Sequence, residues 1–256
     1  MELGLQGKGV LVTGAAGGIG SAIVRAFVSE GAKVALHYRS SEERAEALAS
    51  ETGAVPVQGD LTIEADVERV FTTALSELGR VNVLIANAGY WPPEDVPIWE
   101  LSYQRWRETI AVDLDSVFLC CREFLKHVVD TRTGNIVLIS STAGIFGEAG
   151  HADYAAAKSA LAGGLLKSLK NEIVRIAPNG RVNAVCPGWT ATDMTRAELQ
   201  DAALVDRVKK TMALNKIGTA DDVARVVVTL ASDEVSGHVT GEAITVAGGM
   251  EGRLLR

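Results

Sequence analysis

Short, almost wholly apolar stretches alternate along the chain with longer stretches in which apolar residues recur every three or four positions. The apolar stretches lie at 9–13, 33–38, 54–58, 81–86, 135–140, 181–186 and 243–246. The longer stretches, whose spacing predicts amphipathic helices, lie at 19–30, 42–51, 65–78, 103–128, 154–176 and 220–231. Apolar strands suit burial on both faces, and alternating strands and helices form parallel sheets. We therefore predict an α/β fold, a doubly wound parallel sheet with helices on both faces.

The segment 189–217 has no counterpart in this alternation. It follows Pro187 and Gly188 directly, at the end of a predicted strand. Open α/β sheets bind ligands beyond the carboxyl ends of their strands, so we expect a helical flap over a ligand site. The alternative is a surface excursion that does not contact substrate. No linker-like stretch divides the chain, and we treat 1–256 as a single domain.

Composition and charge exclude several functional classes. The formal charge is −7, with 25 Lys and Arg against 32 Asp and Glu, which argues against a nucleic-acid surface. The chain lacks a signal-peptide pattern and an apolar run of about 20 residues, so we expect no membrane association and a cytoplasmic location. The three cysteines and four histidines form no spaced cluster, so we expect neither a disulfide framework nor a catalytic metal.

A glycine-rich turn joins the first predicted strand to the first predicted helix. It reads Thr13-Gly14-Ala15-Ala16-Gly17-Gly18-Ile19-Gly20, in which Gly14, Gly18 and Gly20 form a Gly-x-x-x-Gly-x-Gly pattern. Glycines let the backbone amides at a helix N-terminus approach a pyrophosphate. The spacing differs from the Gly-x-Gly-x-x-Gly fingerprint, but the position between a strand and a helix predicts a Rossmann-type dinucleotide site.

The residues that follow the second predicted strand bear on the choice of dinucleotide. An NAD-selective site places Asp or Glu there, against the ribose 2′-hydroxyl, whereas this chain has Tyr38, Arg39, Ser40 and Ser41. A guanidinium and hydroxyl groups suit a 2′-phosphate. We therefore expect a preference for NADP(H), with NAD(H) as the weaker cofactor. The alternative is that Arg39 is a solvated loop residue.

Three side chains in the second half of the chain form a candidate redox site. Tyr154 and Lys158 stand one helical turn apart and share a helix face, and Ser141 lies thirteen residues before Tyr154 at the end of a predicted strand. A phenol with an ordinary pKa of about 10 becomes a useful acid or base only where its surroundings shift that value, and a nearby ammonium favours the ionised form. This arrangement predicts interconversion of a carbonyl and an alcohol.

With these motifs in order, the chain resembles the short-chain dehydrogenase/reductase family over essentially its whole length. The resemblance rests on the glycine turn, Asp60-Leu61, Asn87-Ala88-Gly89, Ser141, Tyr154-x-x-x-Lys158 and Pro187-Gly188-x-x-x-Thr192. It implies that Asp60 and Leu61 face the adenine and that Asn87, Ala88 and Gly89 line the cofactor. It further implies that 187–192, which includes Thr190, holds the nicotinamide carboxamide.

The resemblance also implies the roles of the catalytic residues. Ser141 would hydrogen-bond the substrate oxygen, Tyr154 would exchange a proton with it, and Lys158 would bind the nicotinamide ribose and tune the phenol. Hydride passes directly between the nicotinamide and the substrate carbon, so protein groups mainly orient the reactants and stabilise developing charge. Ser140 is the rival to Ser141, but the spacing to Tyr154 favours Ser141.

The chain departs from the family pattern at one position of this site, because the family usually has Asn where this chain has Asp113. In the family, that Asn supports a water-mediated proton route to the lysine. Asp keeps a carbonyl oxygen but loses the amide donor, and an ionised Asp adds negative charge. We expect Asp113 to modify the proton route and activity to survive.

The leading hypothesis is an NADP(H)-dependent oxidoreductase that interconverts a ketone and a secondary alcohol, similar to the 3-oxoacyl-[acyl-carrier-protein] reductases. Its substrate would be a small carbonyl compound or alcohol, free or linked to an acidic carrier protein that docks on basic side chains such as Arg105, Arg107, Arg122 and Lys126. The alternatives are a dehydrogenase for a sugar, polyol, steroid or other secondary alcohol, and a dinucleotide-binding regulatory or scaffold protein. Resemblance to the family implies a homotetramer or homodimer.

Overall fold

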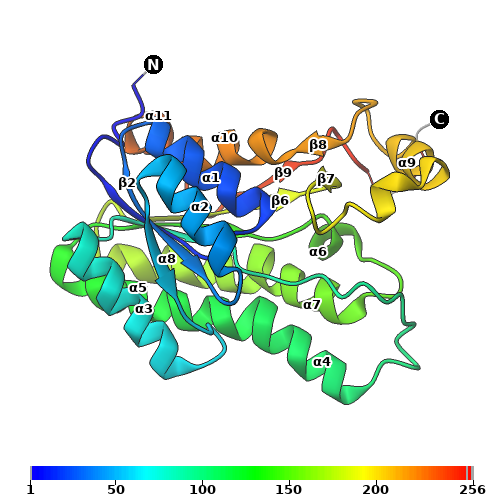
Figure 1. Cartoon of the computed structure of the whole chain (residues 1–256), viewed down its shortest axis with the longest axis horizontal. Helices are drawn as coiled ribbons and strands as arrows, with labels where there is room; N and C mark the ends of the chain where they lie inside the picture. The colour runs from blue at the N-terminus through cyan, green and yellow to red at the C-terminus, as the bar shows by residue number, and fades with distance from the viewer. Residues whose placement is uncertain (1, 252, 255–256) are drawn as a thin grey trace.

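A seven-stranded parallel sheet forms the centre of the molecule (Figure 1). The computed structural model describes residues 2–251 and 253–254. The strand order is β3-β2-β1-β4-β5-β6-β9, in which the strands are Val55–Gln58, Lys33–Tyr38, Gly9–Val12, Val83–Ala86, Asn135–Ile139, Arg181–Pro187 and Ala243–Val246. Each neighbouring pair is parallel, which confirms the predicted doubly wound sheet.

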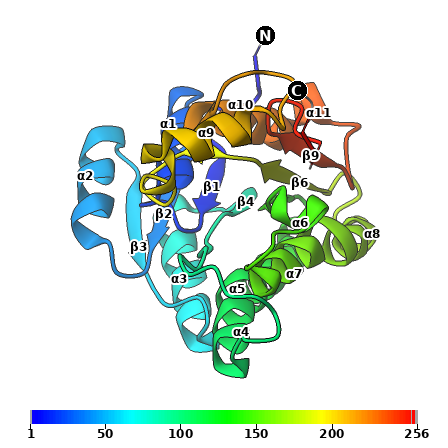
Figure 2. The same cartoon turned by 90° about the vertical axis from the view of Figure 1, so that its right-hand side faces the viewer.

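Helices cover both faces of the sheet (Figures 1 and 2). One face carries α1 (Gly18–Ser29), α2 (Glu42–Thr52) and α10 (Ala220–Ala231), with the short α11 (Asp233–Ser236) after α10. The other face carries α3 (Glu64–Leu78), α5 (Ser116–Thr131) and α8 (Leu166–Ile176). Successive strand residues point to opposite faces, so Val10 and Val12 of β1 pack into the first core and Leu11 into the second. Each of these three side chains is fully buried.

Two long predicted helices each contain a π-helical turn. One runs from α4 (Tyr103–Ile110) through Ala111–Asp115 into α5. The other runs from α7 (Ala152–Ala160) through Leu161–Leu165 into α8. Single π-helical turns often mark functional sites. The first of these turns contains Asp113 and the second begins three residues after Lys158, so both lie beside the candidate redox residues.

The segment 189–217 forms an excursion whose two ends are joined. β7 (Thr190–Ala191) pairs with β8 (Gly218–Thr219) outside the main sheet. Between them lie the 3-10 turn Glu198–Gln200 and α9 (Ala202–Lys209). Figure 1 shows α9 at the end of the molecule where α4 and α7 begin, and Figure 2 looks onto this end. The predicted helix is present, while contact between this flap and a substrate stays a prediction.

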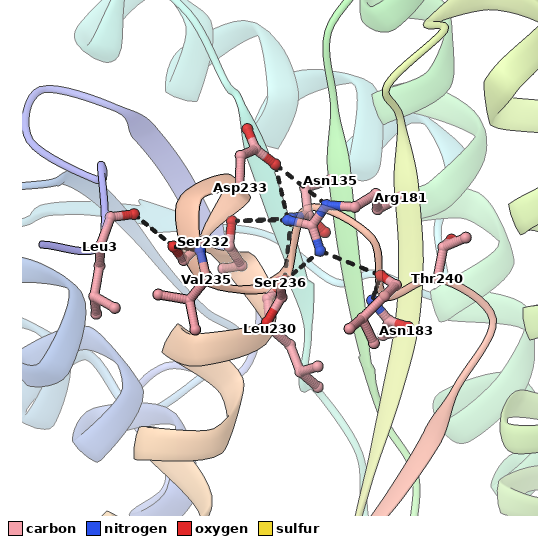
Figure 3. A network of polar contacts seen from close by, with 12 residues as sticks. Leu3, Asn135, Arg181, Asn183, Leu230, Ser232, Asp233, Val235, Ser236 and Thr240 are labelled. Carbon is pink, nitrogen blue, oxygen red and sulfur yellow. Dashed lines mark hydrogen bonds and ion pairs between the residues drawn. The ribbon is translucent and has the colours of Figure 1, made fainter. Parts of the chain in front are cut away.

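A buried polar network ties the sheet to the end of α10 (Figure 3). Arg181, which is 3% exposed at the start of β6, donates hydrogen bonds to the carbonyl oxygens of Leu230 at 2.8 Å and Ala231 at 3.3 Å. It also donates to the Asp233 carboxylate at 2.8 Å. Asn135 donates to the same two carbonyl oxygens. The last carbonyls of a helix have no partner within it, so these donors satisfy the C-terminal end of α10.

We expect Arg181→Met to lower the free energy of unfolding by about 2–4 kcal/mol, because it removes charged donors from buried carbonyl oxygens. Asp233→Asn is the matched control. The Asp233 side chain is 68% exposed, and loss of its ion pair should cost less than about 1 kcal/mol. Urea denaturation of the wild type and both variants measures these differences, and equal losses in the two variants would assign the stability to the ion pair instead.

Candidate active site

A cleft of about 440 Å³ opens beyond the carboxyl ends of the central strands. It brings together Ser141, which follows β5, with Tyr154 and Lys158 of α7. A second hollow of about 230 Å³ lies past the end of β2 and shares lining residues with the first, namely Gly14, Gly17, Ala88, Gly89 and Tyr90. The shared residues lie after β1 and β4, where the strand order changes direction. Open α/β sheets bind their ligands at this point.

Lys158 is held in a buried ion pair. Its Nζ lies 3.1 Å from Oδ1 of Asp113, donates to the carbonyl oxygen of Ile139 at 3.3 Å, and lies 5.5 Å from the centre of the Tyr154 ring. Asp113 is fully buried and Lys158 is 3% exposed. Burial by itself would lower the pKa of Lys158, but the Asp113 carboxylate and the Tyr154 phenol together outweigh burial and hold that pKa above its ordinary value. The lysine therefore stays charged beside the phenol.

Asp113 also fixes the backbone that follows β4. Its Oδ1 accepts a hydrogen bond from the backbone N–H of Tyr90 at 3.1 Å. A Cβ atom on Gly89 would lie 2.6 Å from Asp113 Oδ1 and 2.9 Å from Lys158 Nζ, so a larger residue there would displace the ion pair. Burial raises the pKa of Asp113, and the Lys158 ammonium opposes this effect. Asp113 thus positions both the lysine and the loop at Gly89.

The Tyr154 phenol and the Ser141 hydroxyl face the same cleft, and hydrogen bonding from Ser141 lowers the pKa of the phenol. Burial is the largest influence and raises the pKa of Tyr154, and although Lys158 and Ser141 lower it, the net pKa is above its ordinary value. The phenol is therefore protonated at neutral pH. The Ser141 hydroxyl also accepts a hydrogen bond from the backbone N–H of Ala143 at 3.1 Å, which fixes the side chain. Two hydroxyl groups can thus bind one carbonyl oxygen, and one of them can donate a proton.

The two neighbouring serines have different surroundings. The Ser140 hydroxyl is buried and donates to the backbone carbonyl oxygen of Lys158 at 2.7 Å. It therefore joins the end of β5 to α7. Ser141 is the serine whose hydroxyl meets the Tyr154 phenol, in agreement with the spacing argument.

The glycine turn leaves the N-terminus of α1 without a capping side chain. Gly17 precedes the helix and supplies no cap, and Gly17 to Gly20 line the cleft. Gly14 has a φ of +62°, and a Cβ atom there would lie 2.8 Å from Cα of Ala88. The first N–H groups of a helix have no partner within it. This bare backbone at a helix N-terminus fits the pyrophosphate of a dinucleotide.

Thr13 and Asn87 support the glycine turn from behind. The Thr13 hydroxyl accepts hydrogen bonds from the backbone N–H groups of Asn87 at 2.9 Å and Ala88 at 3.0 Å. The Asn87 amide donates to the carbonyl oxygens of Thr13 and Gly14. Thr13 is 1% exposed and lies outside the lining of both hollows.

The other cofactor residues predicted from the sequence line either the cleft, which is the first hollow, or the second hollow. The first hollow, besides Tyr154 and Lys158, includes Gly14, Gly18, Ile19, Gly20, Asn87, Ala88, Gly89, Pro187, Gly188, Thr190 and Thr192. The second includes Tyr38, Arg39, Ser40, Asp60 and Leu61. Residues far apart in the sequence are thus gathered along one continuous surface.

His37 has a role that the sequence analysis did not assign. It is 2% exposed in β2, and its Nδ1 accepts from the backbone N–H of Gly14 at 3.1 Å. Its Nε2 can then carry the proton and donate to the carbonyl oxygen of Gly59 at 3.0 Å, which joins the glycine turn to the residue after β3. Burial lowers the pKa of His37 to about 4. The hint in the sequence is a titratable residue inside an otherwise apolar strand.

Acidification should weaken the fold through His37. Unfolded histidine has a pKa of about 6.5, so the unfolded chain binds a proton that the folded chain excludes until about pH 4. Protonation of His37 in the unfolded chain should therefore lower the free energy of unfolding by about 2 kcal/mol as the pH falls from about 6.5 to about 5. Asparagine in His37→Asn keeps an acceptor for the Gly14 N–H but does not titrate. The free energy of unfolding of this variant should therefore fall less than that of the wild type over the same pH range. Urea unfolding of the wild type and of His37→Asn over this pH range measures the difference. An equal fall in the free energy of unfolding of both proteins would contradict the prediction.

Arg105 is a structural tether, and its role as a carrier-protein contact stays a prediction. Its guanidinium pairs with the buried Asp153 at 3.0 Å, and the arginine side chain is 17% exposed. It also donates to the carbonyl oxygens of Glu94 and Gly150. Arg105 therefore holds the 90–101 segment to the start of α7. Arg122 and Lys126 pair with neighbouring glutamates, whereas Arg107 is exposed on α4.

Comparisons with known proteins agree with this geometry. A family model described as enoyl-(acyl carrier protein) reductase matches residues 14–251. The chain is 37% identical over 253 residues to the 3-oxoacyl-[acyl-carrier-protein] reductase FabG of Salmonella typhimurium, which covers 97% of this chain and 99% of that protein. The chain belongs to the short-chain dehydrogenase/reductase family.

Two further relatives extend this likeness. The 3-oxoacyl-[acyl-carrier-protein] reductase FabG of Escherichia coli is 36% identical over 253 residues, which cover 97% of this chain and 99% of that protein. The corresponding reductase of Synechocystis is 32% identical over 252 residues, which cover 96% and 98%. As a short-chain dehydrogenase/reductase, this chain is an oxidoreductase that acts on C=O and CH–OH groups with a nicotinamide dinucleotide.

Residues 2–251 and 253–254 contain no group of three or more His, Cys, Asp or Glu side chains placed to hold a metal ion. Within the same ranges, no helix combines the length and the apolar character needed to cross a bilayer. The three cysteines, Cys120, Cys121 and Cys186, are buried free thiols.

Proposed function

We propose that this short-chain dehydrogenase/reductase is an NADPH-dependent reductase of 3-oxoacyl thioesters. The observation that carries the proposal is the Ser141 and Tyr154 hydroxyl pair beside the buried Lys158 ammonium, with the phenol protonated at neutral pH. A protonated phenol is the form that reduction of a carbonyl requires. The relatives that are 32% and 37% identical are named for reduction of 3-oxoacyl groups on acyl carrier protein.

The proposed reaction divides the work among four side chains. Ser141 and Tyr154 donate hydrogen bonds to the substrate carbonyl oxygen, and Tyr154 gives up its proton as that oxygen becomes an alcohol. Lys158 stabilises the phenolate that remains, and Asp113 positions Lys158. The dinucleotide, held along the glycine turn and the 187–192 segment, supplies a hydride when bound.

The outer part of the cleft supports an acyl substrate over a sugar or polyol. Its lining includes large apolar side chains, namely Trp91, Phe146, Trp189, Met194 and Met250. Two of these, Trp189 and Met194, belong to the 189–217 segment, and they support our proposal that this segment is a flap over the substrate. An apolar wall suits an acyl chain, whereas a polyol would need several hydrogen-bond partners.

The preference for NADPH is part of the proposal. Arg39 is exposed and lines the second hollow with Tyr38, Ser40 and Ser41. Removing a charged donor from a phosphate contact typically costs about 1.5–3 kcal/mol, so Arg39→Ala should lower kcat/KM for NADPH by about 10–100-fold and change kcat/KM for NADH much less. Steady-state kinetics with both dinucleotides measures the ratio of kcat/KM for NADPH to kcat/KM for NADH. Near-equal efficiencies in the wild type would contradict the preference.

We also propose a homotetramer or homodimer, with the helices on one face of the sheet forming the contact. Phe118 and Val129 of α5 and Val174 of α8 are 49%, 50% and 43% exposed. Exposed apolar side chains on neighbouring helices are typical of subunit interfaces. Analytical ultracentrifugation of the wild type tests the assembly, and a monomer at micromolar concentration would contradict it.

Oxidation of NADPH in the presence of a panel of carbonyl compounds tests the function. The panel contains a 3-oxobutanoyl thioester, the matching 2-enoyl thioester, a simple ketone and a sugar-derived carbonyl. We expect oxidation with the 3-oxobutanoyl thioester that is lost in Tyr154→Phe, and little with the enoyl thioester, because the two hydroxyl groups bind a carbonyl oxygen. Activity confined to the other carbonyls would overturn the substrate class, and binding of NADPH without any turnover would favour a regulatory role.

A further inference from the structure

A carboxylate lines the cleft that contains the redox residues. Glu148 stands between α6 (Ala143–Phe146) and α7, and it lines the same cleft as Ser141 and Tyr154. Its negative charge is close enough to contribute to the raised pKa of the Tyr154 phenol. Any substrate whose carbonyl oxygen meets Ser141 and Tyr154 must therefore also meet the field of Glu148.

A stacked pair of rings lies beside Glu148. Burial raises the pKa of the Glu148 carboxyl, and hydrogen bonding from the Trp91 side chain opposes this rise. The Trp91 ring stacks on His151, with ring centres 4.6 Å apart and planes inclined by 16°. His151 is 4% exposed, and its two ring nitrogens lie 2.9 Å from the carbonyl oxygen of Pro92 and 3.4 Å from that of Ala149. Trp91 and His151 thus pack together next to Glu148, which lines the wall of the cleft.

The cations that line the cleft are engaged elsewhere. Lys158 pairs with the buried Asp113. Arg44 of α2 pairs with Asp193 at 2.9 Å. Among the described residues that line the cleft, these are the Lys and Arg side chains. The wall around Glu148 thus presents a negative charge without a lining cation that could bind a substrate carboxylate.

We propose that Glu148 is a specificity-determining residue, which admits neutral 3-oxoacyl derivatives and rejects the corresponding free 3-oxo acids. The inference rests on the proposed function, because a thioester masks the carboxylate that Glu148 would repel. Like charges in a partly buried site repel more strongly than in water. The repulsion acts on the bound substrate and on the transition state alike, so it raises KM for the acid and leaves kcat nearly as it is.

Kinetics with a matched pair of substrates tests the proposal. We would measure kcat/KM for 3-oxobutanoyl N-acetylcysteamine and for 3-oxobutanoate in the wild type, in Glu148→Gln and in Glu100→Gln. The ratio of the thioester value to the acid value should fall about tenfold in Glu148→Gln, through a lower KM for the acid. Glu100 is an exposed carboxylate that does not line the cleft, and its variant should keep the wild-type ratio.

Glutamine keeps an acceptor for the Trp91 indole, so a purely structural role would leave the ratio unchanged. An unchanged ratio, or an equal change for both substrates, overturns the proposal. If Glu148→Gln melts at a lower temperature, Glu148→Ser must show the same fall in the ratio. If the wild type reduces no thioester, the proposed function fails, and the ratio for methyl 4-oxopentanoate over 4-oxopentanoate then decides the role of Glu148 in the same way.

Discussion

Replacing Tyr154 with phenylalanine should lower kcat for carbonyl reduction by about 10²–10⁴-fold. The phenol meets the Ser141 hydroxyl, its pKa is raised by burial, and it is the protonated group placed to supply the substrate oxygen. Phenylalanine keeps the ring beside Lys158 but cannot donate a proton. Single-turnover measurements with saturating NADPH separate the loss in chemistry from any change in cofactor affinity, which should be much smaller.

Tyr103→Phe is the matched control for this prediction. Tyr103 is 77% exposed at the start of α4 and lies outside the cleft, so loss of its hydroxyl should change kcat by less than about threefold. If Tyr154→Phe retained more than a tenth of the wild-type kcat, another group would have to supply the proton. The protonated phenol would then not be the feature on which catalysis depends.

Substitution of Asp113 should affect stability and the pH dependence of catalysis separately. Asp113→Leu removes the carboxylate from the buried Lys158 ammonium, and breaking such a pair costs about 3–5 kcal/mol. Asp113→Asn keeps a carbonyl oxygen for the Tyr90 N–H and for Lys158, so it should unfold closer to the wild-type denaturant concentration. Urea denaturation of the wild type and both variants measures these losses, and wild-type stability of Asp113→Leu would contradict the role of the ion pair.

Asp113→Asn should also move the pH profile of ketone reduction. The Asp113 carboxylate raises the pKa of Tyr154, so its removal lowers that pKa. Reduction requires the protonated phenol and declines as the phenol ionises, so the alkaline limb should move to lower pH. Measurement of kcat across the alkaline range for both proteins shows the shift. An unmoved limb would contradict it, and a rise in turnover by several orders of magnitude would mean that the native site is impaired.

The hydrophobic pattern predicted the architecture well because the five central strands of the main sheet, β2, β1, β4, β5 and β6, are buried on both faces. The ranges 33–38, 220–231 and 243–246 coincide with β2, α10 and β9. The π-helical turn at Ala111–Asp115 was not predicted, because one extra residue in a turn leaves no distinct trace in an apolar periodicity. Its position matters, since it places Asp113 in contact with Lys158.

Residues of the site that belong to a recognisable spacing could be proposed from the sequence, and residues that act through tertiary contacts could not. Tyr154 and Lys158 share a helix face, which their separation of four residues already indicates. His37 contacts Gly14 and Gly59 across neighbouring strands, and Arg105 contacts Asp153 from another helix. Glu148 stands three residues before His151, whose ring stacks on Trp91 from another part of the chain. No local pattern contains these pairings.

The pairing of β7 with β8 affects how the excursion between them can vary in evolution. The chain leaves and rejoins the body of the protein at one place, where the N–H of Gly218 donates to the carbonyl oxygen of Trp189 at 3.0 Å. When the ends of a loop are already joined, each doubling of its length costs only about 0.6 kcal/mol in closure entropy. Ser141, Tyr154 and Lys158 come from other parts of the chain. The part of the excursion after Thr192 could therefore change in length and sequence, so that descendants of this sequence acquire new substrates while they keep the same catalytic residues.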